Sequence, residues 1–128
     1  MNNQKILVID DEEPITMVVK ASLEDKYDVA TTNSALSAFK FMSKNKVDLV
    51  LLDIKMPRIN GIEALKEIKK IHPKTDVIML TGFASEDHIQ KAKELGAYGF
   101  ITKPFDVREL RSYIDRVLSR NGNSERIA

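Results

Sequence analysis

The chain has 128 residues, of which 20 are basic and 19 are acidic, and its formal net charge is +1. This length suits one domain with its own buried core, and the near balance of charge gives no reason to expect a nucleic acid or a membrane surface as a partner. The absence of cysteine excludes disulfide frameworks and thiol nucleophiles, and with no signal segment or long apolar run we expect a soluble, cytoplasmic protein.

The first half of the sequence predicts three strands that alternate with two helices. Residues 6–9 form a continuous apolar run, and residues 47–52 form a run that only Asp48 interrupts. Both runs are typical of strands buried on both faces, and a weaker alternating strand covers 27–31. Both apolar runs stop at acids: Asp10 and Asp11 after the first, and Asp53 after the second. The apolar positions that predict the buried helix faces are Ile15, Val18, Val19 and Leu23, and then, after a cap at Ser34, Leu36, Phe39, Phe41 and Met42.

The second half predicts two more strands and three more helices. The strands cover residues 77–80 and 98–102, and turn residues over 55–61 lead into the first of the helices. Thr81 ends one strand and Lys103 follows the other. The apolar positions of the first helix are Ile62, Leu65, Ile68 and Ile71. Those of the second are Ile89, Ala92 and Leu95, between an N-cap at Ser85 and a C-cap at Gly96. Those of the third, which follow a capping box of Asp106 and Glu109, are Leu110, Tyr113, Ile114, Val117 and Leu118.

Five strands alternating with five helices predict an α/β fold in which consecutive strands are parallel and joined by right-handed crossovers. We expect one domain over residues 1–120, followed by a frayed polar tail over 121–128. In open parallel sheets the ligand site lies beyond the carboxyl ends of the strands. The acids, the threonine and the lysine that follow the predicted strands fall at those ends.

A single sheet would gather Asp10, Asp11, Asp53, Thr81 and Lys103 along one edge. Three converging carboxylates repel one another and need a cation, which is either a hard divalent metal or the ammonium group of Lys103. Ligation by oxygen alone suits Mg²⁺, with Mn²⁺ as a substitute, and no spaced loop of the kind that binds Ca²⁺ is present. An aspartate carboxylate beside such an ion is a competent nucleophile toward phosphorus and yields an acyl phosphate.

Taken singly, each of these residues has a simpler explanation. An acid at a strand end is usually a turn residue or a helix cap. Thr81 could merely end a strand, and Lys103 could be a solvated surface lysine. Their joint placement at successive strand ends favours a chemical site. His72 and His88 do not follow strands, and we expect both to be solvated and to take no part in the site.

Four motifs together resemble the receiver domain of two-component response regulators, over residues 4–118. The motifs are Ile9-Asp10-Asp11, Leu52-Asp53 followed by Met56-Pro57 and Gly61, Thr81-Gly82, and Lys103-Pro104-Phe105. The resemblance implies a flavodoxin-like fold, with a five-stranded parallel sheet in the order 2-1-3-4-5 and helices on both faces. Residues 52–55, 89–90 and 93–97 are also similar to the single-domain receiver of the bacterial sporulation phosphorelay, which passes its phosphoryl group to a second histidine.

The resemblance also implies a role for each site residue. Asp53 is the phosphoacceptor, and Thr81 and Lys103 contact the phosphoryl group. Mg²⁺ is bound by Asp11 and Asp53 directly, by Asp10 mostly through water, and by the backbone carbonyl of Lys55. The Lys103–Pro104 peptide is cis, a state essentially confined to bonds before proline. Thr81 and Phe100 form the switch, in which the aromatic ring follows the hydroxyl inward after phosphorylation; the alternative for Phe100 is a permanently buried core residue.

The implied phosphoryl donor is a phosphohistidine on a sensor histidine kinase or a histidine phosphotransfer protein, and the output is a downstream protein target. We expect no direct binding of nucleic acid or membrane, and a signalling switch in place of a turnover enzyme. One alternative is a Mg²⁺-dependent phosphatase or phosphotransferase, but such enzymes have a second Asp two residues after the nucleophile, where this chain has Lys55. The other is a degenerate receiver that only binds partners, against which the intact acids, Thr81 and Lys103 argue.

Overall fold

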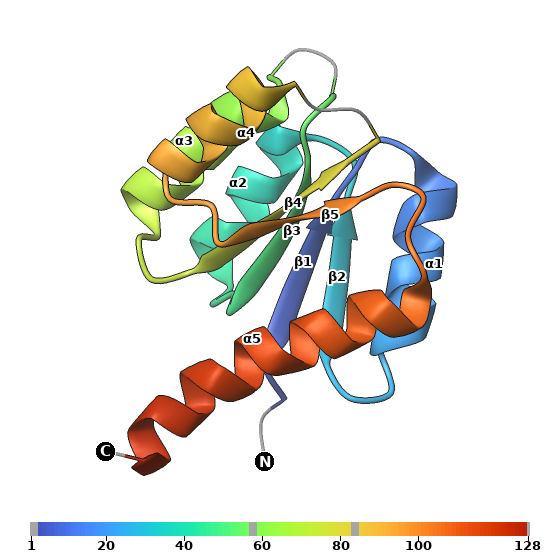
Figure 1. Cartoon of the computed structure of the whole chain (residues 1–128), viewed down its shortest axis with the longest axis vertical. Helices are drawn as coiled ribbons and strands as arrows, with labels where there is room; N and C mark the ends of the chain where they lie inside the picture. Colours follow the sequence, from blue (N-terminus) through green and yellow to red (C-terminus); the bar gives the residue numbers. More distant parts are fainter. Residues whose placement is uncertain (1–2, 57–58, 83–84, 128) are drawn as a thin grey trace.

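The computed structural model describes residues 3–56, 59–82 and 85–127, so that Pro57 of the second motif lies outside the described residues. Within these ranges, strands and helices alternate along the whole chain, as the sequence predicts (Figure 1). The elements are β1 (Lys5–Ile9), α1 (Glu13–Leu23), β2 (Asp28–Thr32), α2 (Ala35–Lys44), β3 (Leu49–Asp53), α3 (Gly61–Ile71), β4 (Asp76–Thr81), α4 (Glu86–Glu94), β5 (Gly99–Thr102) and α5 (Val107–Ile127).

The strands form one parallel sheet in the order β2-β1-β3-β4-β5, which confirms the predicted topology. Helices α2, α3 and α4 cover one face, and α1 and α5 cover the other (Figure 1). Residues 49–52 of β3 are fully buried, and they alternate between the two hydrophobic layers: Val50 and Leu52 face α2 to α4, whereas Leu49 and Leu51 face α1 and α5. Burial on both faces explains why this strand is a continuous apolar run.

Most of the apolar helix positions that the sequence pattern predicts are buried or partly buried, with three exceptions. Val18, Leu36 and Ile71 were expected on buried faces, but all three are exposed. In α2 the buried residues are Ala35, Ala38 and Met42, one position away from the face centred on Leu36. A helix approaches a sheet most closely where its side chains are short, so the alanines of α2 face the sheet and the larger leucine faces solvent. Ile71 is the last residue of α3, where no further turn of the helix covers it.

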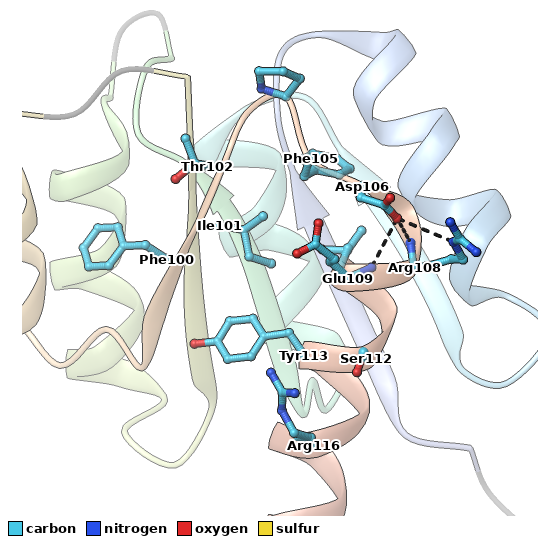
Figure 2. A pocket seen from close by; sticks show the side chains of 12 residues that line it. Phe100, Ile101, Thr102, Phe105, Asp106, Arg108, Glu109, Ser112, Tyr113 and Arg116 are labelled. Atoms are coloured by element: carbon cyan, nitrogen blue, oxygen red, sulfur yellow. Dashed lines mark hydrogen bonds and ion pairs between the residues drawn. The ribbon is translucent and has the colours of Figure 1, made fainter.

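Helix ends follow their predicted signals, with one correction. Ser34 and Ser85 cap α2 and α4, and Gly96 after α4 has a φ of 101°. The reciprocal capping box was predicted at Asp106, but the structure forms it at Asn60, which begins α3, together with Glu63. Asp106 accepts hydrogen bonds from the backbone N–H groups of residues 108 and 109 and caps α5 alone (Figure 2).

The end of the chain also differs from the expected frayed tail, because α5 continues to Ile127. No proline interrupts residues 107–127, and the single glycine in this stretch, Gly122, costs only about 1 kcal/mol relative to alanine in a helix. The backbone can therefore continue its hydrogen-bonding pattern past Asn121. Among the described helices, none combines the length and the apolar character that crossing a bilayer requires.

Candidate functional site

The carboxyl edge of the sheet brings the predicted site residues together. Asp10 directly follows β1, Asp53 is the last residue of β3, and Thr81 is the last residue of β4. The strand register places Ile9 beside Leu52. The residues that follow them, Asp10 and Asp53, therefore lie at neighbouring positions. Because the strands are parallel and in register, all of their final residues face the same end of the molecule.

The three acids form one compact cluster. Asp10, Asp11 and Asp53 each contribute a carboxylate oxygen to a group whose members lie within 4.8 Å of one another. Asp10 and Asp53 are buried, whereas Asp11 is exposed. Carboxylates this close repel one another, and burial strengthens that repulsion. The cluster therefore has the charge and the all-oxygen donor set that a hard divalent cation such as Mg²⁺ requires.

Lys103 supplies the positive charge within the cluster. Its Nζ lies 2.7 Å from Oδ2 of Asp10 and 3.5 Å from Oδ2 of Asp53. A third carboxylate, that of Glu12, lies 3.0 Å from the same nitrogen. Burial by itself would lower the pKa of Lys103, but hydrogen bonds to Asp10 and Glu12 outweigh it and raise the pKa above its ordinary value. The ammonium group is therefore charged at neutral pH.

The surroundings of Asp53 disfavour its ionised form. Burial and the negative charge of Asp10 raise the pKa of Asp53 from 3.8 to about 6, and the nearby Lys103 only partly opposes this. One ammonium group is thus insufficient to neutralise the paired acids. An additional cation at the cluster would favour the ionised, nucleophilic form of Asp53.

Backbone contacts fix the position of Asp53. Oδ1 of Asp53 accepts a hydrogen bond of 3.2 Å from the backbone N–H of Lys55. Gly61 at the start of α3 donates its N–H to the carbonyl of Ile54 at 2.8 Å. A Cβ atom at Gly61 would overlap the carbonyl oxygen of Asp53, so only glycine permits this approach. The glycine of the second motif therefore has a structural reason, whereas the role of the Lys55 carbonyl stays a prediction.

Thr81 offers an unused donor at the edge of the cluster. Its side chain is buried, and its Oγ1 has no hydrogen-bond partner among the described residues. A buried hydroxyl without a partner costs free energy, and it is typical of a site that awaits a ligand. The buried Oγ1 of Thr32, at the end of β2, is in the same state. Sequence reasoning did not identify Thr32, because a threonine at the end of a weak strand carries no distinguishing pattern.

The remaining predicted residues lie around strand β5. The Lys103–Pro104 peptide is cis, as expected. Phe100 is partly buried against the hydrophobic layer of α2 to α4, and it points to the opposite side of β5 from Ile101 (Figure 2). The ring has intermediate burial, and both the switching role of Phe100 and its alternative as a permanent core residue stay predictions.

Glu12 is the site residue that the sequence interpretation missed. It follows the two acids of the first motif, and its carboxylate contacts Lys103 from the start of α1. The available signal was an acidic residue with a long side chain at a helix N-cap, where shorter side chains are preferred. His72 lies at the end of α3 and His88 lies on α4, and neither belongs to the acid cluster.

The family model described as the response regulator receiver domain matches residues 6–115. The chain belongs to this family. The strand order, the clustered acids and the cis peptide before Pro104 are therefore the features of a receiver domain, and the chain is a homologue of proteins of two-component and phosphorelay signalling.

Relatives of two kinds are similar to this receiver domain. It is 37% identical over 124 residues to the sporulation initiation phosphotransferase F of Bacillus subtilis (strain 168), covering 96% of this chain and 100% of that protein. It is also 37% identical over 120 residues to the alkaline phosphatase synthesis transcriptional regulatory protein PhoP of the same organism, covering 93% of this chain and 50% of PhoP. The chain therefore spans the whole length of the sporulation phosphotransferase and half the length of PhoP.

A solved structure supports the same assignment. The CheY-like response regulator receiver domain protein of Methanospirillum hungatei JF-1 superposes with a TM-score of 0.92 at 30% sequence identity. The superposition covers 96% of this chain and 99% of that chain. The predicted flavodoxin-like architecture is thus confirmed by both the topology and its structural relative.

Proposed function

We propose that this receiver domain accepts a phosphoryl group on Asp53 from a phosphohistidine of a sensor histidine kinase or a histidine phosphotransfer protein. The observation that carries the proposal is the placement of the buried Asp53 within 4.8 Å of two further acids and 3.5 Å from the ammonium group of Lys103. A carboxylate so placed is neither a helix cap nor a surface charge. The whole-length similarity to a sporulation phosphotransferase favours onward transfer to a second histidine.

The transfer is a displacement at phosphorus. A carboxylate oxygen of Asp53 forms the new O–P bond, and the N–P bond of the donor phosphohistidine breaks with its electron pair going to the imidazole nitrogen. Lys103 would contact one phosphoryl oxygen, and the hydroxyl of Thr81, which has no partner among the described residues, would donate to another; the distance of 3.5 Å between Lys103 and Asp53 supports the first role. Both groups stabilise negative charge that is carried by the phosphoryl oxygens.

The acid cluster fits Mg²⁺, for which Mn²⁺ would substitute. Asp11 and Asp53 would hold the ion directly, with the backbone carbonyl of Lys55, and Asp10 would act mostly through water. When bound, such an ion offsets the repulsion between the acids and the phosphoryl oxygens. Burial and the negative charge of Asp10, which raise the pKa of Asp53, support this assignment.

The consequence of phosphorylation would be a change in protein binding, without turnover of a substrate. The buried hydroxyl of Thr81 would gain a partner by moving toward the phosphoryl group, and the partly buried ring of Phe100 would follow it inward. A local change in charge then biases a two-state element near β5. A downstream protein would read this change, in the cytoplasm and without direct contact to nucleic acid or membrane.

The decisive experiment is incorporation of a phosphoryl group from acetyl phosphate or phosphoramidate, followed by intact mass with and without Mg²⁺. We expect one Mg²⁺-dependent adduct on the wild-type chain and none on Asp53→Asn. Asp87→Asn, which changes an exposed aspartate on α4, is the matched control and should form the adduct normally. A folded wild-type chain that binds Mg²⁺ and yet forms no adduct would leave a partner-binding receiver without phosphoacceptor chemistry.

A further inference from the structure

Glu12 occupies an unusual place at the start of α1. It is the N-cap residue of the helix, yet its side chain makes no capping hydrogen bond, whereas Ser34, Asn60 and Ser85 cap α2, α3 and α4. Short side chains are preferred at this position because they reach the free N–H groups of the first turn. The carboxylate of Glu12 instead accepts a hydrogen bond of 3.0 Å from Nζ of Lys103.

Lys103 is shared among three carboxylates. Its Nζ lies 2.7 Å from Asp10, 3.0 Å from Glu12 and 3.5 Å from Asp53. Hydrogen bonds to Asp10 and Glu12 occupy two of the three N–H donors of the ammonium group, and Asp53 lies at ion-pair distance. The charged oxygens of a phosphoryl group on Asp53 must therefore share the ammonium group with Asp10 and Glu12.

Of the three carboxylates, that of Glu12 is the easiest to release. Its side chain is 61% exposed, whereas the side chains of Asp10 and Asp53 are 0% and 6% exposed. Losing the lysine would leave a buried acid without its cation, but Glu12 would simply return to water. Glu12 also lies outside the group of three acids that could hold a metal ion.

We propose that Glu12 is a positioning residue that holds Lys103 at the acid cluster while Asp53 is unmodified, and that it competes with the phosphoryl oxygen for the same ammonium group. This inference rests on the proposed role of Asp53. The competition weakens binding of the phosphoryl group, while the negative charge of Glu12 beside the cluster strengthens binding of a divalent cation. The two effects have opposite signs, which a residue with only a structural role would not produce.

The test uses two probes on the full chain: Mg²⁺ alone, and beryllofluoride at saturating Mg²⁺ as a non-covalent phosphoryl analogue. Glu12→Gln should bind beryllofluoride about two- to five-fold more tightly and Mg²⁺ alone about two- to five-fold more weakly, as the loss of a partly exposed ion pair implies. Because the chain has no tryptophan, amide NMR titrations are the suitable measurement. Glu13→Gln removes the same charge one residue later, from a side chain that forms no ion pair with Lys103 within the described structure, and should leave the beryllofluoride affinity unchanged.

Lys103→Met distinguishes competition from a general effect of charge. In that background Glu12→Gln should produce no gain in beryllofluoride affinity, because the shared ammonium group is gone. An equal gain in both backgrounds, or equal behaviour of Glu12→Gln and Glu13→Gln, would overturn the proposal and leave the role of Asp53 intact. A wild-type chain that binds Mg²⁺ but neither beryllofluoride nor a phosphoryl group would instead overturn the proposed function and this inference together.

Discussion

At the scale of single residues, Asp53 combines burial with a neighbouring negative charge. It is 4% exposed and lies beside Asp10, which is fully buried. The ionised form is therefore less stable in the metal-free folded chain than in the unfolded chain, and the pKa of Asp53 rises from 3.8 to about 6. Burial beside another acid makes Asp53 reactive when a cation binds. Without a cation, the same surroundings lower the free energy of unfolding at neutral pH.

Replacing Asp53 with asparagine should stabilise the metal-free chain in a pH-dependent way. Below pH 3.8 the carboxyl group is protonated in both states and contributes no difference. Between pH 3.8 and about 6 the unfolded chain releases its proton first, so the wild type loses stability as the pH rises through this window. Above it, Asp53→Asn should have a free energy of unfolding about 2–3 kcal/mol higher than that of the wild type.

Urea denaturation in EDTA, monitored by circular dichroism between about pH 3.5 and about pH 8, measures this difference. Asp87→Asn, at an exposed position on α4, should show no such pH dependence. Saturating Mg²⁺ should reverse the order of stability at neutral pH, because the ion binds the folded wild type and stabilises it. A pH-independent difference between Asp53→Asn and the wild type would contradict the assignment of the raised pKa to Asp53.

At the scale of elements, the start of α3 and the end of β3 constrain each other. The N–H of Gly61 bonds to Ile54, and the absence of a side chain at Gly61 lets the helix approach the Asp53 carbonyl. Gly82, after β4, has no such constraint: a Cβ there would lie 3.8 Å from Cβ of Lys103, which is an ordinary contact. Of these two glycines at the same edge of the sheet, only Gly61 is required by the atoms around it.

Alanine substitutions at these two glycines should have opposite effects. Gly61→Ala forces backbone against backbone and should lower the free energy of unfolding by about 1–3 kcal/mol, with weaker Mg²⁺ binding because Asp53 is displaced. Gly82→Ala should be neutral or stabilise by up to about 1 kcal/mol, because alanine restricts the unfolded chain. Urea denaturation and Mg²⁺ titration of both variants provide the measurement. Equal destabilisation by the two alanines would show that the close approach at Gly61 is not the cause.

At the scale of the whole molecule, the connection between α1 and β2 is joined to α5 at the end of the sheet opposite the acids. The hydroxyl of Tyr27, just before β2, donates to Oδ1 of Asp115 on α5, and Lys26 lies 3.3 Å from the same oxygen. Arg111 of α5 donates to Asp25 at 2.7 Å. Burial, and then the hydrogen bond to Asp115, raise the pKa of Tyr27, so its hydroxyl stays protonated and remains a donor. These contacts stabilise the fold at a distance from the site.

Tyr27→Phe should therefore reduce stability without changing the chemistry of the site. Removing the hydroxyl leaves Asp115 with Lys26 alone, and the loss of a hydrogen bond to a charged group implies a decrease of about 1–3 kcal/mol in the free energy of unfolding. The rate of phosphoryl incorporation from acetyl phosphate at a temperature where the variant is folded should equal that of the wild type. A large change in that rate would mean that the two ends of the sheet are coupled.

The sequence by itself determined the α/β class, the order of the elements and the residues of the site other than Glu12, because buried parallel strands require apolar runs and because chemical groups follow those runs. The motif around Asp53 and the lysine before Pro104 were recognisable without coordinates. Helix faces were less predictable: Leu36 fits an apolar stripe as well as Ala38 does, and only packing against the sheet chose the smaller residue.

Tertiary structure alone decided the contacts between residues distant in the chain. The hydrogen bond from Lys103 to Glu12 joins residues that are 91 positions apart, and the spacing of those two residues carries no periodic signal that predicts it. The tight approach of Gly61 to Asp53 likewise depends on where whole elements pack, and so does the lack of a partner for the Thr81 hydroxyl within the described part of the chain. Sequence patterns report the local period and the ends of elements, whereas electrostatic partners are set by the folded arrangement of strands and helices.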